Sequence, residues 1–150
     1  MAEPQYDPDC IFCKIIRGAI PSVRVLETDQ AVAFLDINPL NPGHVLLVPR
    51  THHAHLGELP DDAAAHAGSL LPRLCRAVAA ATAAEGFNVL VNNGRVAGQT
   101  VGHGHWHIIP RYRNDPIHWP WPQGKTTGDE LHQMKARIEA ELTGASGAAS

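Results

Sequence analysis

The chain has 150 residues, of which 44% are hydrophobic and 18% charged, and its formal net charge is -3 at pH 7. This length and composition predict one globular domain and exclude a disordered, highly charged chain. The slight negative charge argues against a protein that binds nucleic acid by neutralising phosphates, and no apolar run is long enough to span a membrane. The acidic, polar start, Met1–Asp7, is unlike a secretory signal, so we expect the protein in the cytoplasm.

The two ends of the chain are expected to lie outside the domain. Residues 1–8 contain two prolines, and residues 144–150 are all Gly, Ala or Ser. Both compositions predict disorder. A single domain is therefore expected over residues 9–143.

The first half of the chain predicts a short helix and three strands. Asp9 can cap a helix that runs to about Ile16 and ends before Gly18. Alternating or continuous apolar runs separated by turn-forming residues then predict strands. These runs are Val23–Glu27, Ala31–Leu35 and His44–Pro49.

The second half predicts two more strands and two longer helices. An Ala-rich helix should begin after Pro60, be kinked or interrupted at Pro72 and end at about Glu85, because Gly86 follows. The other elements are expected at Phe87–Val91, His103–Ile109 and Asp129–Leu142. Five strands, with helices grouped rather than alternating with them, predict an α+β fold with a five-stranded, mostly antiparallel sheet.

Ten residues are histidine, where average usage gives roughly three, and three of them alternate in His103-Gly104-His105-Trp106-His107. On a strand, alternate side chains share a face, so the three imidazoles would lie about 6.6–6.8 Å apart in succession. Such a row is costly unless it shares a partner, which can be a metal ion or an anion such as phosphate. The preceding loop, which ends in Gly98-Gln99-Thr100, can present main-chain N–H groups and favours an anion.

Taken in order, these motifs resemble the histidine-triad (HIT) family of nucleotide hydrolases and transferases, and in particular its bacterial, zinc-containing members. The resemblance covers about residues 9–115 and implies a HIT-like fold that forms a homodimer with the two sheets side by side. The segments that carry it are Cys10–Ile16, Phe34–Pro39, Gly43–Pro49, Gly98–Thr100 and His103–Ile109.

The resemblance implies that His105 attacks the α-phosphorus of a nucleotide to give a covalent nucleotidyl-histidine, which water then hydrolyses. His107 would donate to the phosphate or the leaving group, and His44 would lie close by as a further active-site histidine. Because the third triad position is His107 and not glutamine, the chain resembles the hydrolase branches. The implied substrates are purine nucleoside phosphoramidates, nucleotidyl adducts or dinucleoside polyphosphates. A nucleotide-binding regulatory or scaffold protein with little turnover is the alternative.

Ten further residues match nucleotide-binding positions of the family. Gln99 and Thr100 would contact phosphate oxygens, Asn92 would approach the ribose-phosphate, and Asp36 would accept from the ribose hydroxyls. An apolar slot for the base would be formed by Ile11, Phe12, Ile15, Ile20, Phe34 and Ile37. For the residues of this slot, ordinary core packing is the alternative.

The pair Cys10-x-x-Cys13 lacks the βαβ context of a redox motif. In zinc-containing members, positions that match His52 and His103 complete a Cys-Cys-His-His site, which implies one structural zinc per chain. An idle thiol pair is the alternative, and His53 and His55 are alternative ligands. A third hypothesis for the function is a zinc-storage or redox protein.

Other residues depart from the family pattern or have no assigned role. A glycine within a strand, as at Gly104, predicts a close main-chain approach or a bulge, and Trp106 is bulkier than usual. Trp119 and Trp121 can form a binding lip, a dimer contact or part of the core. The histidines expected at the surface without a special role are His66, His118 and His132.

Overall fold

The computed structural model describes residues 5–118 and 122–148, so Trp119 and Trp121 lie outside the described residues. The chain forms two compact units, Met1–Ile117 and His118–Ser150. The single domain over residues 9–143 stays a prediction. Among the described residues, all the buried hydrophobic residues lie between Cys10 and Pro110. The second unit contributes the helix α3 (Gly128–Ala148), which extends beyond Leu142 into the segment expected to be disordered.

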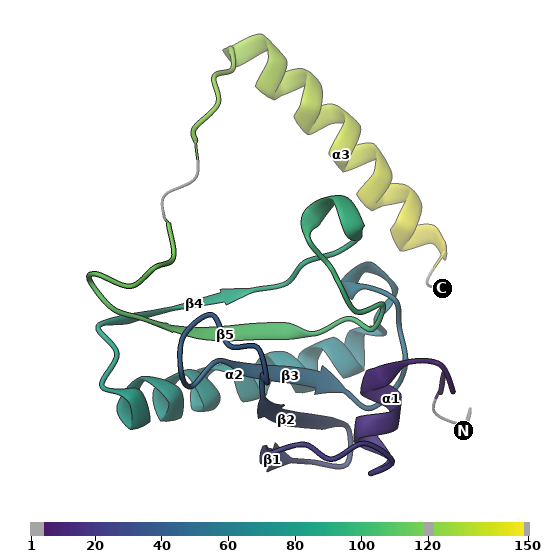
Figure 1. Ribbon diagram of the computed structural model, residues 1–150. Coiled ribbons are helices and arrows are strands. Elements are labelled where there is room, and N and C mark those ends of the chain that lie inside the picture. Colours follow the sequence, from purple (N-terminus) through teal and green to yellow (C-terminus); the bar gives the residue numbers. More distant parts are fainter. Residues whose placement is uncertain (1–4, 119–121, 149–150) are drawn as a thin grey trace. The chain divides into compact units, whose positions relative to one another are not determined.

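The first unit contains a short helix, five strands and a long helix (Figure 1). The helices are α1 (Ile11–Ile16) and α2 (Asp61–Thr82), and two 3-10 turns are η1 (Leu56–Glu58) and η2 (Arg95–Ala97). The strands are β1 (Arg24–Glu27), β2 (Ala31–Leu35), β3 (Val45–Pro49), β4 (Gly86–Leu90) and β5 (Trp106–Arg111). No helix among the described residues is both long and apolar enough to cross a membrane.

The five strands form one antiparallel sheet in the order β1-β2-β3-β5-β4. This confirms the predicted α+β fold with a five-stranded sheet. In Figure 1, α2 lies behind the sheet and α1 in front of its β1–β3 end. The sheet is therefore covered on both faces at its centre, which explains why β3 is buried at every position.

The pleat of the central strands separates two hydrophobic clusters. Ala33 and Leu47 belong to the cluster that packs against α2, whereas Phe34 and Leu46 belong to the cluster that includes α1. Because alternate side chains point to opposite faces, the pairing of Leu46 with His107 places His107 on the α1 face. The candidate site is thus fixed to one face of the sheet by strand register.

Two predicted helix ends are wrong in detail. The cap of α1 is Cys10 and not Asp9, and its Sγ accepts from the main-chain N–H of Cys13 at 3.5 Å. Helix α2 ends at Thr82, because Ala83 adopts a left-handed conformation with φ 52° and caps it. The predicted interruption at Pro72 does not occur; this proline lies on the exposed side of α2, where a missing hydrogen bond does not disturb core packing.

The last strand begins at Trp106, three residues later than predicted. Before it, the main-chain N–H of Gly104 donates to the carbonyl of His53 at 2.7 Å instead of joining the sheet. A Cβ on Gly104 would lie only 3.3 Å from the carbonyl carbon of His55, which confirms the close approach predicted for this glycine. His103 and His105 therefore precede β5, and only His107 lies on it.

Candidate active site

The turn before β5 points successive histidines of the triad to different partners. His105 is 4% exposed, and its Nδ1 lies 2.7 Å from the main-chain carbonyl of His103. A carbonyl oxygen can only accept, so Nδ1 carries the proton. In the neutral ring the other nitrogen, Nε2, then has a free lone pair. Burial lowers the pKa of His105, which favours this neutral form.

A second chain of hydrogen bonds fixes the protons of His44 and His107. The main-chain N–H of Leu40 donates to Nδ1 of His44 at 3.1 Å, so neutral His44 carries its proton on Nε2. That nitrogen lies 2.9 Å from Nδ1 of His107 and donates to it. His107 must then carry its own proton on Nε2. The pair therefore presents one N–H donor beside the lone pair of His105, whose ring centroid is 4.8 Å from that of His107.

Burial keeps these imidazoles neutral near pH 7. It lowers the pKa of His107 to about 4, with His105 and His44 adding to the effect. The pKa of His44 is lowered for the same first reason, although the carboxylate of Asp36 opposes the shift. Asp36 Oδ2 lies 3.8 Å from His44 Nε2. The site thus combines an unprotonated nitrogen, a neutral N–H donor and one nearby carboxylate.

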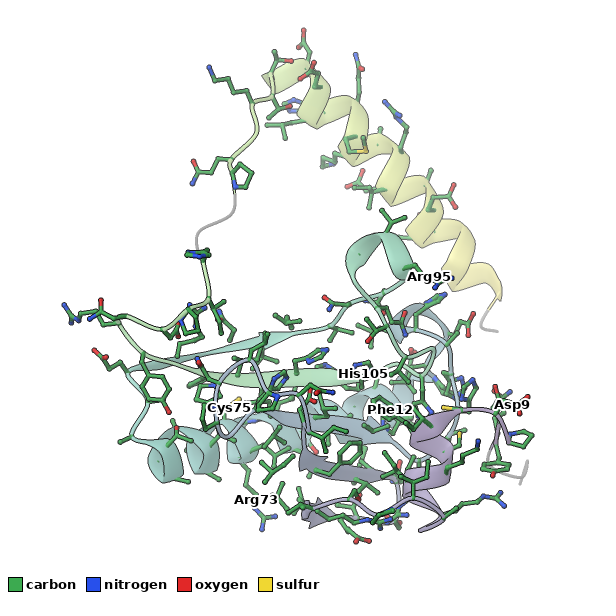
Figure 2. All side chains as sticks on the ribbon, viewed as in Figure 1. Asp9, Phe12, Arg73, Cys75, Arg95 and His105 are labelled. Atoms are coloured by element: carbon green, nitrogen blue, oxygen red, sulfur yellow. The ribbon has the colours of Figure 1, made fainter. Side chains whose placement is uncertain are left out.

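A cavity of about 620 Å³ opens beside the three rings. Figure 2 shows His105 and Phe12 next to each other, and their ring centroids are 5.0 Å apart. Every predicted nucleotide-binding residue except Gln99 lines this cavity, namely Ile11, Phe12, Ile15, Ile20, Phe34, Asp36, Ile37, Asn92 and Thr100. The fold therefore brings these residues, which are distant in the sequence, together around one cavity.

Gln99 does not line the cavity. Its side chain instead forms hydrogen bonds with main-chain groups of the protein. Its Nε2 donates to the carbonyls of Ala54 and Val101, at 2.6 and 2.9 Å, while its Oε1 accepts from the N–H of Gly94. This residue therefore holds the loop 92–100 in place. A glutamine between Gly98 and Thr100 gives no sequence signal that separates this role from phosphate binding.

Two contributors to the site are not evident from the sequence. The main-chain N–H of Leu40 sets the proton position of His44, and only the density of turn formers before His44 hints at such a contact. Ser22 lines the cavity, and its Oγ is buried without a hydrogen-bond partner among the described residues. No motif singles out this serine.

A second cluster brings together the four predicted metal-ligating residues. Ligand atoms of Cys10, Cys13, His52 and His103 all lie within 4.8 Å of one another. Nε2 of His103 lies 2.8 Å from the carbonyl of Pro49 and donates to it, so its Nδ1 lone pair faces the two sulfurs, at 3.5 and 3.6 Å. Nδ1 of His52 lies 3.3 Å from that of His103.

This donor set fits a zinc ion. Two sulfurs and two imidazole nitrogens are the ligands of many structural zinc sites, and a histidine ligand commonly donates its other N–H to a carbonyl, as His103 does. Burial raises the pKa of the Cys13 thiol to about 11 without a metal. The alternative ligand His55 is directed elsewhere, since its Nδ1 accepts from Gly57 and its Nε2 lies 3.4 Å from Glu58.

His66, which was expected at the surface, is half-buried and contacts another element. Nε2 of His66, on α2, lies 2.8 Å from Oγ1 of Thr28 in the turn between β1 and β2, and the side chain is half-buried. The prediction of a merely exposed residue is therefore wrong for His66. Its contact joins α2 to the sheet edge and lies outside the cavity.

The fold and site define a small α+β protein in which a triad of histidines borders a cavity on one face of an antiparallel sheet. A family model described as the HIT domain matches residues 17–114. The chain belongs to the HIT family.

Related proteins and solved structures agree with this assignment. Adenosine 5'-monophosphoramidase HNT1 of Saccharomyces cerevisiae is 40% identical over 139 residues, covering 92% of this chain and 85% of that protein. Adenylylsulfatase HINT3 of Arabidopsis thaliana is 46% identical over 107 residues, which are 71% of this chain and about half of that protein, 54%.

Among solved structures, SMU.412c from Streptococcus mutans has a TM-score of 0.87 and 38% identity, covering 91% of this chain and 87% of that one. A zinc-bound histidine triad family protein from Mycobacterium smegmatis has a TM-score of 0.69 and 31% identity, with 91% and 97% covered.

Proposed function

We propose that this protein is a nucleotide hydrolase that cleaves the bond between the α-phosphorus of a purine nucleotide and its leaving group. The observation that carries the proposal is the proton arrangement of His105: its Nδ1–H is held by the carbonyl of His103, which leaves the Nε2 lone pair free. The existence of a monophosphoramidase among the relatives supports the same reaction class.

In the first step, Nε2 of His105 forms a bond to phosphorus while the bond from phosphorus to the leaving nitrogen or oxygen breaks. The leaving atom takes that electron pair and a proton from the solvent in the cavity. The ring becomes a cation, which the Nδ1–H bond to the His103 carbonyl stabilises. The Nε2–H of His107 can donate to a phosphate oxygen as the charge moves during the displacement.

In the second step, water attacks the phosphorus of the nucleotidyl-histidine. The Nε2–P bond breaks, its electron pair returns to His105, and the proton of the water passes to the solvent. The net reaction adds one water and releases the nucleoside monophosphate and the free leaving group. Covalent catalysis of this kind divides one difficult displacement into two easier ones.

The cavity supplies partners for the rest of a nucleotide. In this proposal Asp36 accepts from ribose hydroxyls, and Thr100 and Asn92 face the phosphate and ribose. The base occupies the apolar slot, whose inner wall is formed by Phe12, Phe34 and Ile15. Phe12 and Phe34 meet edge to face, with centroids 5.6 Å apart, which gives this wall a defined shape.

We further propose that Cys10, Cys13, His52 and His103 hold one structural zinc ion. When bound, zinc would cross-link the start of α1 to the chain just before β5 and would keep the cysteines as thiolates. His105, two residues after His103, would then follow a segment of chain that the zinc ion holds rigid. The homodimer, the cytoplasmic location and the lack of nucleic-acid binding stay predictions.

The proposal is tested by following release of AMP from adenosine 5'-phosphoramidate. We expect His105→Ala to lower kcat at least about 10³-fold while AMP still binds. His132→Ala, which removes an exposed imidazole on α3, is the matched control and should keep full activity. If the wild type binds AMP but releases none from phosphoramidates, nucleotidyl adducts or dinucleoside polyphosphates, the alternative of a nucleotide-binding regulatory protein is correct.

A further inference from the structure

Helix α1 forms one wall of the cavity but is too short to be stable alone. It has six residues, and isolated helices shorter than about 12–15 residues are marginal in water. Phe12 and Ile15 project from it into the cavity, and Ile20 follows shortly after its end. The wall of the slot therefore depends on contacts that hold each end of α1.

The beginning of α1 lies in the Cys/His cluster. Its end is held by main-chain hydrogen bonds, among them Gly18 N–H to the Ile15 carbonyl at 3.0 Å, and by one arginine side chain from β1. Nη2 of Arg24 donates to the carbonyls of Ile15 and Ile16, at 2.6 and 3.1 Å. The last carbonyls of a helix have no partners within it and carry partial negative charge, so a guanidinium is well suited to this place. Nη2 carries two N–H bonds and can serve both carbonyls, which leaves Nη1 free to donate elsewhere.

A β-bulge directs Arg24 toward α1. Arg24 pairs with Phe34, but Leu26, two residues on, pairs with Ala33, so Val25 is extra in β1. Cross-strand partners share a face of the sheet, and Phe34 belongs to the α1 side. The bulge thus sends Arg24 to the α1 face while Leu26 packs against the other cluster. Without the extra residue, the two side chains would point the same way.

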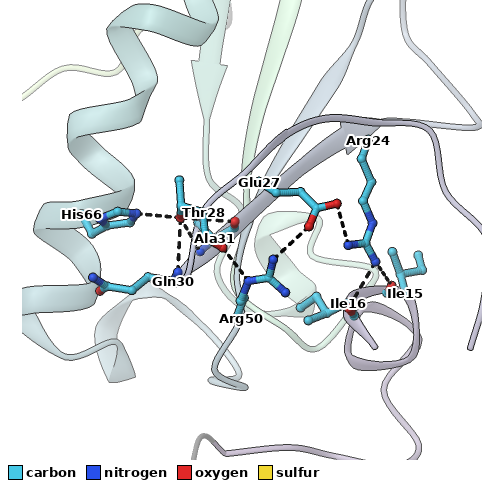
Figure 3. A network of polar contacts seen from close by, with 9 residues as sticks. All are labelled: Ile15, Ile16, Arg24, Glu27, Thr28, Gln30, Ala31, Arg50 and His66. Carbon is cyan, nitrogen blue, oxygen red and sulfur yellow. Dashed lines mark hydrogen bonds and ion pairs between the residues drawn. The ribbon is translucent and has the colours of Figure 1, made fainter. Parts of the chain in front are cut away.

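The guanidinium is fixed in turn by a carboxylate between two arginines (Figure 3). Nη1 of Arg24 donates to Oε1 of Glu27 at 2.9 Å, and Nη2 of Arg50 donates to Oε2 of Glu27 at 3.1 Å. The bond from Arg24 is the main cause of the lowered pKa of Glu27. Nε of Arg50 also donates to the carbonyl of Thr28 at 2.7 Å, which ties the network to the turn after β1.

We propose that Arg24 is a positioning residue for nucleotide binding. By holding the carbonyl end of α1, it keeps the Phe12–Ile15 wall formed before the nucleotide arrives, so binding does not have to order the helix. Arg24 does not line the cavity and takes no part in the reaction at phosphorus. The inference rests on the proposed function, because it concerns the affinity of the same slot.

The test compares Arg24→Gln with Arg24→Lys in the zinc-loaded protein. For Arg24→Gln we expect the KM for adenosine 5'-phosphoramidate and the Kd for AMP to rise about tenfold, with kcat within about twofold of wild type. Amide hydrogen exchange over residues 11–17 should accelerate in the absence of nucleotide. Arg24→Lys keeps the charge at the helix end and should recover a large part of the affinity.

Arg73→Gln, which changes an exposed arginine on α2, is the matched control and should leave KM, Kd and exchange unchanged. The inference is overturned if Arg24→Gln binds AMP as tightly as the wild type, or if kcat falls while KM stays constant. A wild-type protein that neither binds AMP nor releases it would instead refute the proposed function, and the inference with it. A variant with reduced folding is recognised by its melting curve, and Arg24→Lys then decides the question.

Discussion

Two histidine-containing clusters lie on the same side of this sheet, and they differ in the direction of their ring protons. In the Cys/His cluster, Nε2 of His103 donates to the carbonyl of Pro49, so the Nδ1 lone pair of His103 faces two sulfurs, and Nδ1 of His52 lies 3.3 Å from it. In the triad cluster, donors and acceptors alternate from Leu40 through His44 to His107. A lone pair that faces two sulfurs suits a cation, whereas the alternating hydrogen bonds present one donor to an anion.

The comparison shows that the partner of the second ring nitrogen decides what a buried histidine can do. Asp36, His44 and His107 also lie within 4.8 Å of one another, as metal ligands would. Their two rings are already joined by a 2.9 Å hydrogen bond, so a cation would have to displace that proton. The distance between ligand atoms alone does not separate the two kinds of site; the donor types and the hydrogen-bond partners of His103 and His44 do.

The largest effect is expected from variants that disrupt the Cys/His cluster and leave the triad cluster intact. Replacing both cysteines, Cys10→Ser with Cys13→Ser, should abolish stoichiometric zinc binding and lower the free energy of unfolding by several kcal/mol, because zinc binding contributes directly to folding. Metal analysis and urea unfolding measure the two effects. Cys75→Ser is the control for the metal analysis and should keep one zinc per chain, since this cysteine of α2 lies outside the cluster. A double variant that keeps one zinc per chain would show that the ligands are misassigned.

A smaller effect is expected from breaking the hydrogen bonds that run from Leu40 through His44 to His107. His44→Phe removes the donor to His107 and frees that ring to change its proton position, so kcat should fall about 10²-fold. Zinc content should stay at one per chain and the KM should change little. Steady-state kinetics and metal analysis measure this. Loss of zinc in His44→Phe would show that the two clusters are not independent.

The smallest effect is a pH dependence of stability. His107 has a pKa of about 4 in the folded protein and near 6.5 when unfolded. Between these values the unfolded chain binds the proton and the folded protein does not, so the free energy of unfolding should fall as the pH drops from about 6.5 to 4. Above about pH 6.5 the effect vanishes. Burial also lowers the pKa of His103 to about 4, so His107→Asn should make the curve less steep in that window without removing its slope. An equally steep curve would exclude His107 as a contributor.

Strand alternation and turn-forming residues were sufficient to predict the sheet and most strand limits, because these signals are local. The start of β5 could not be found in this way, since the main chain at Gly104 is drawn to His53 and His55, about fifty residues earlier. The end of α2 at Ala83 depends on a left-handed alanine, which no propensity predicts.

The candidate site was predicted better by motif than by local structure. The family pattern identified twelve of the cavity-lining residues, which are the nine nucleotide-binding residues and His44, His105 and His107, and it named all four residues of the Cys/His cluster. The family pattern predicted that Gln99 contacts phosphate oxygens. Residue type alone does not reveal that the side-chain amide of Gln99 is already hydrogen-bonded to main-chain groups. Arg24 was missed, since its role comes from a bulge that only strand pairing reveals.

The most direct test of the account is to look for the covalent intermediate. The zinc-loaded protein is mixed with adenosine 5'-phosphoramidate, quenched with alkali within milliseconds and mapped by mass spectrometry. We predict one adenylyl group on His105 and none on His44 or His107, and no adduct in His105→Ala. Rapid release of AMP by the wild type without any adduct, or an adduct on another histidine, would contradict the assignment of His105 as the nucleophile.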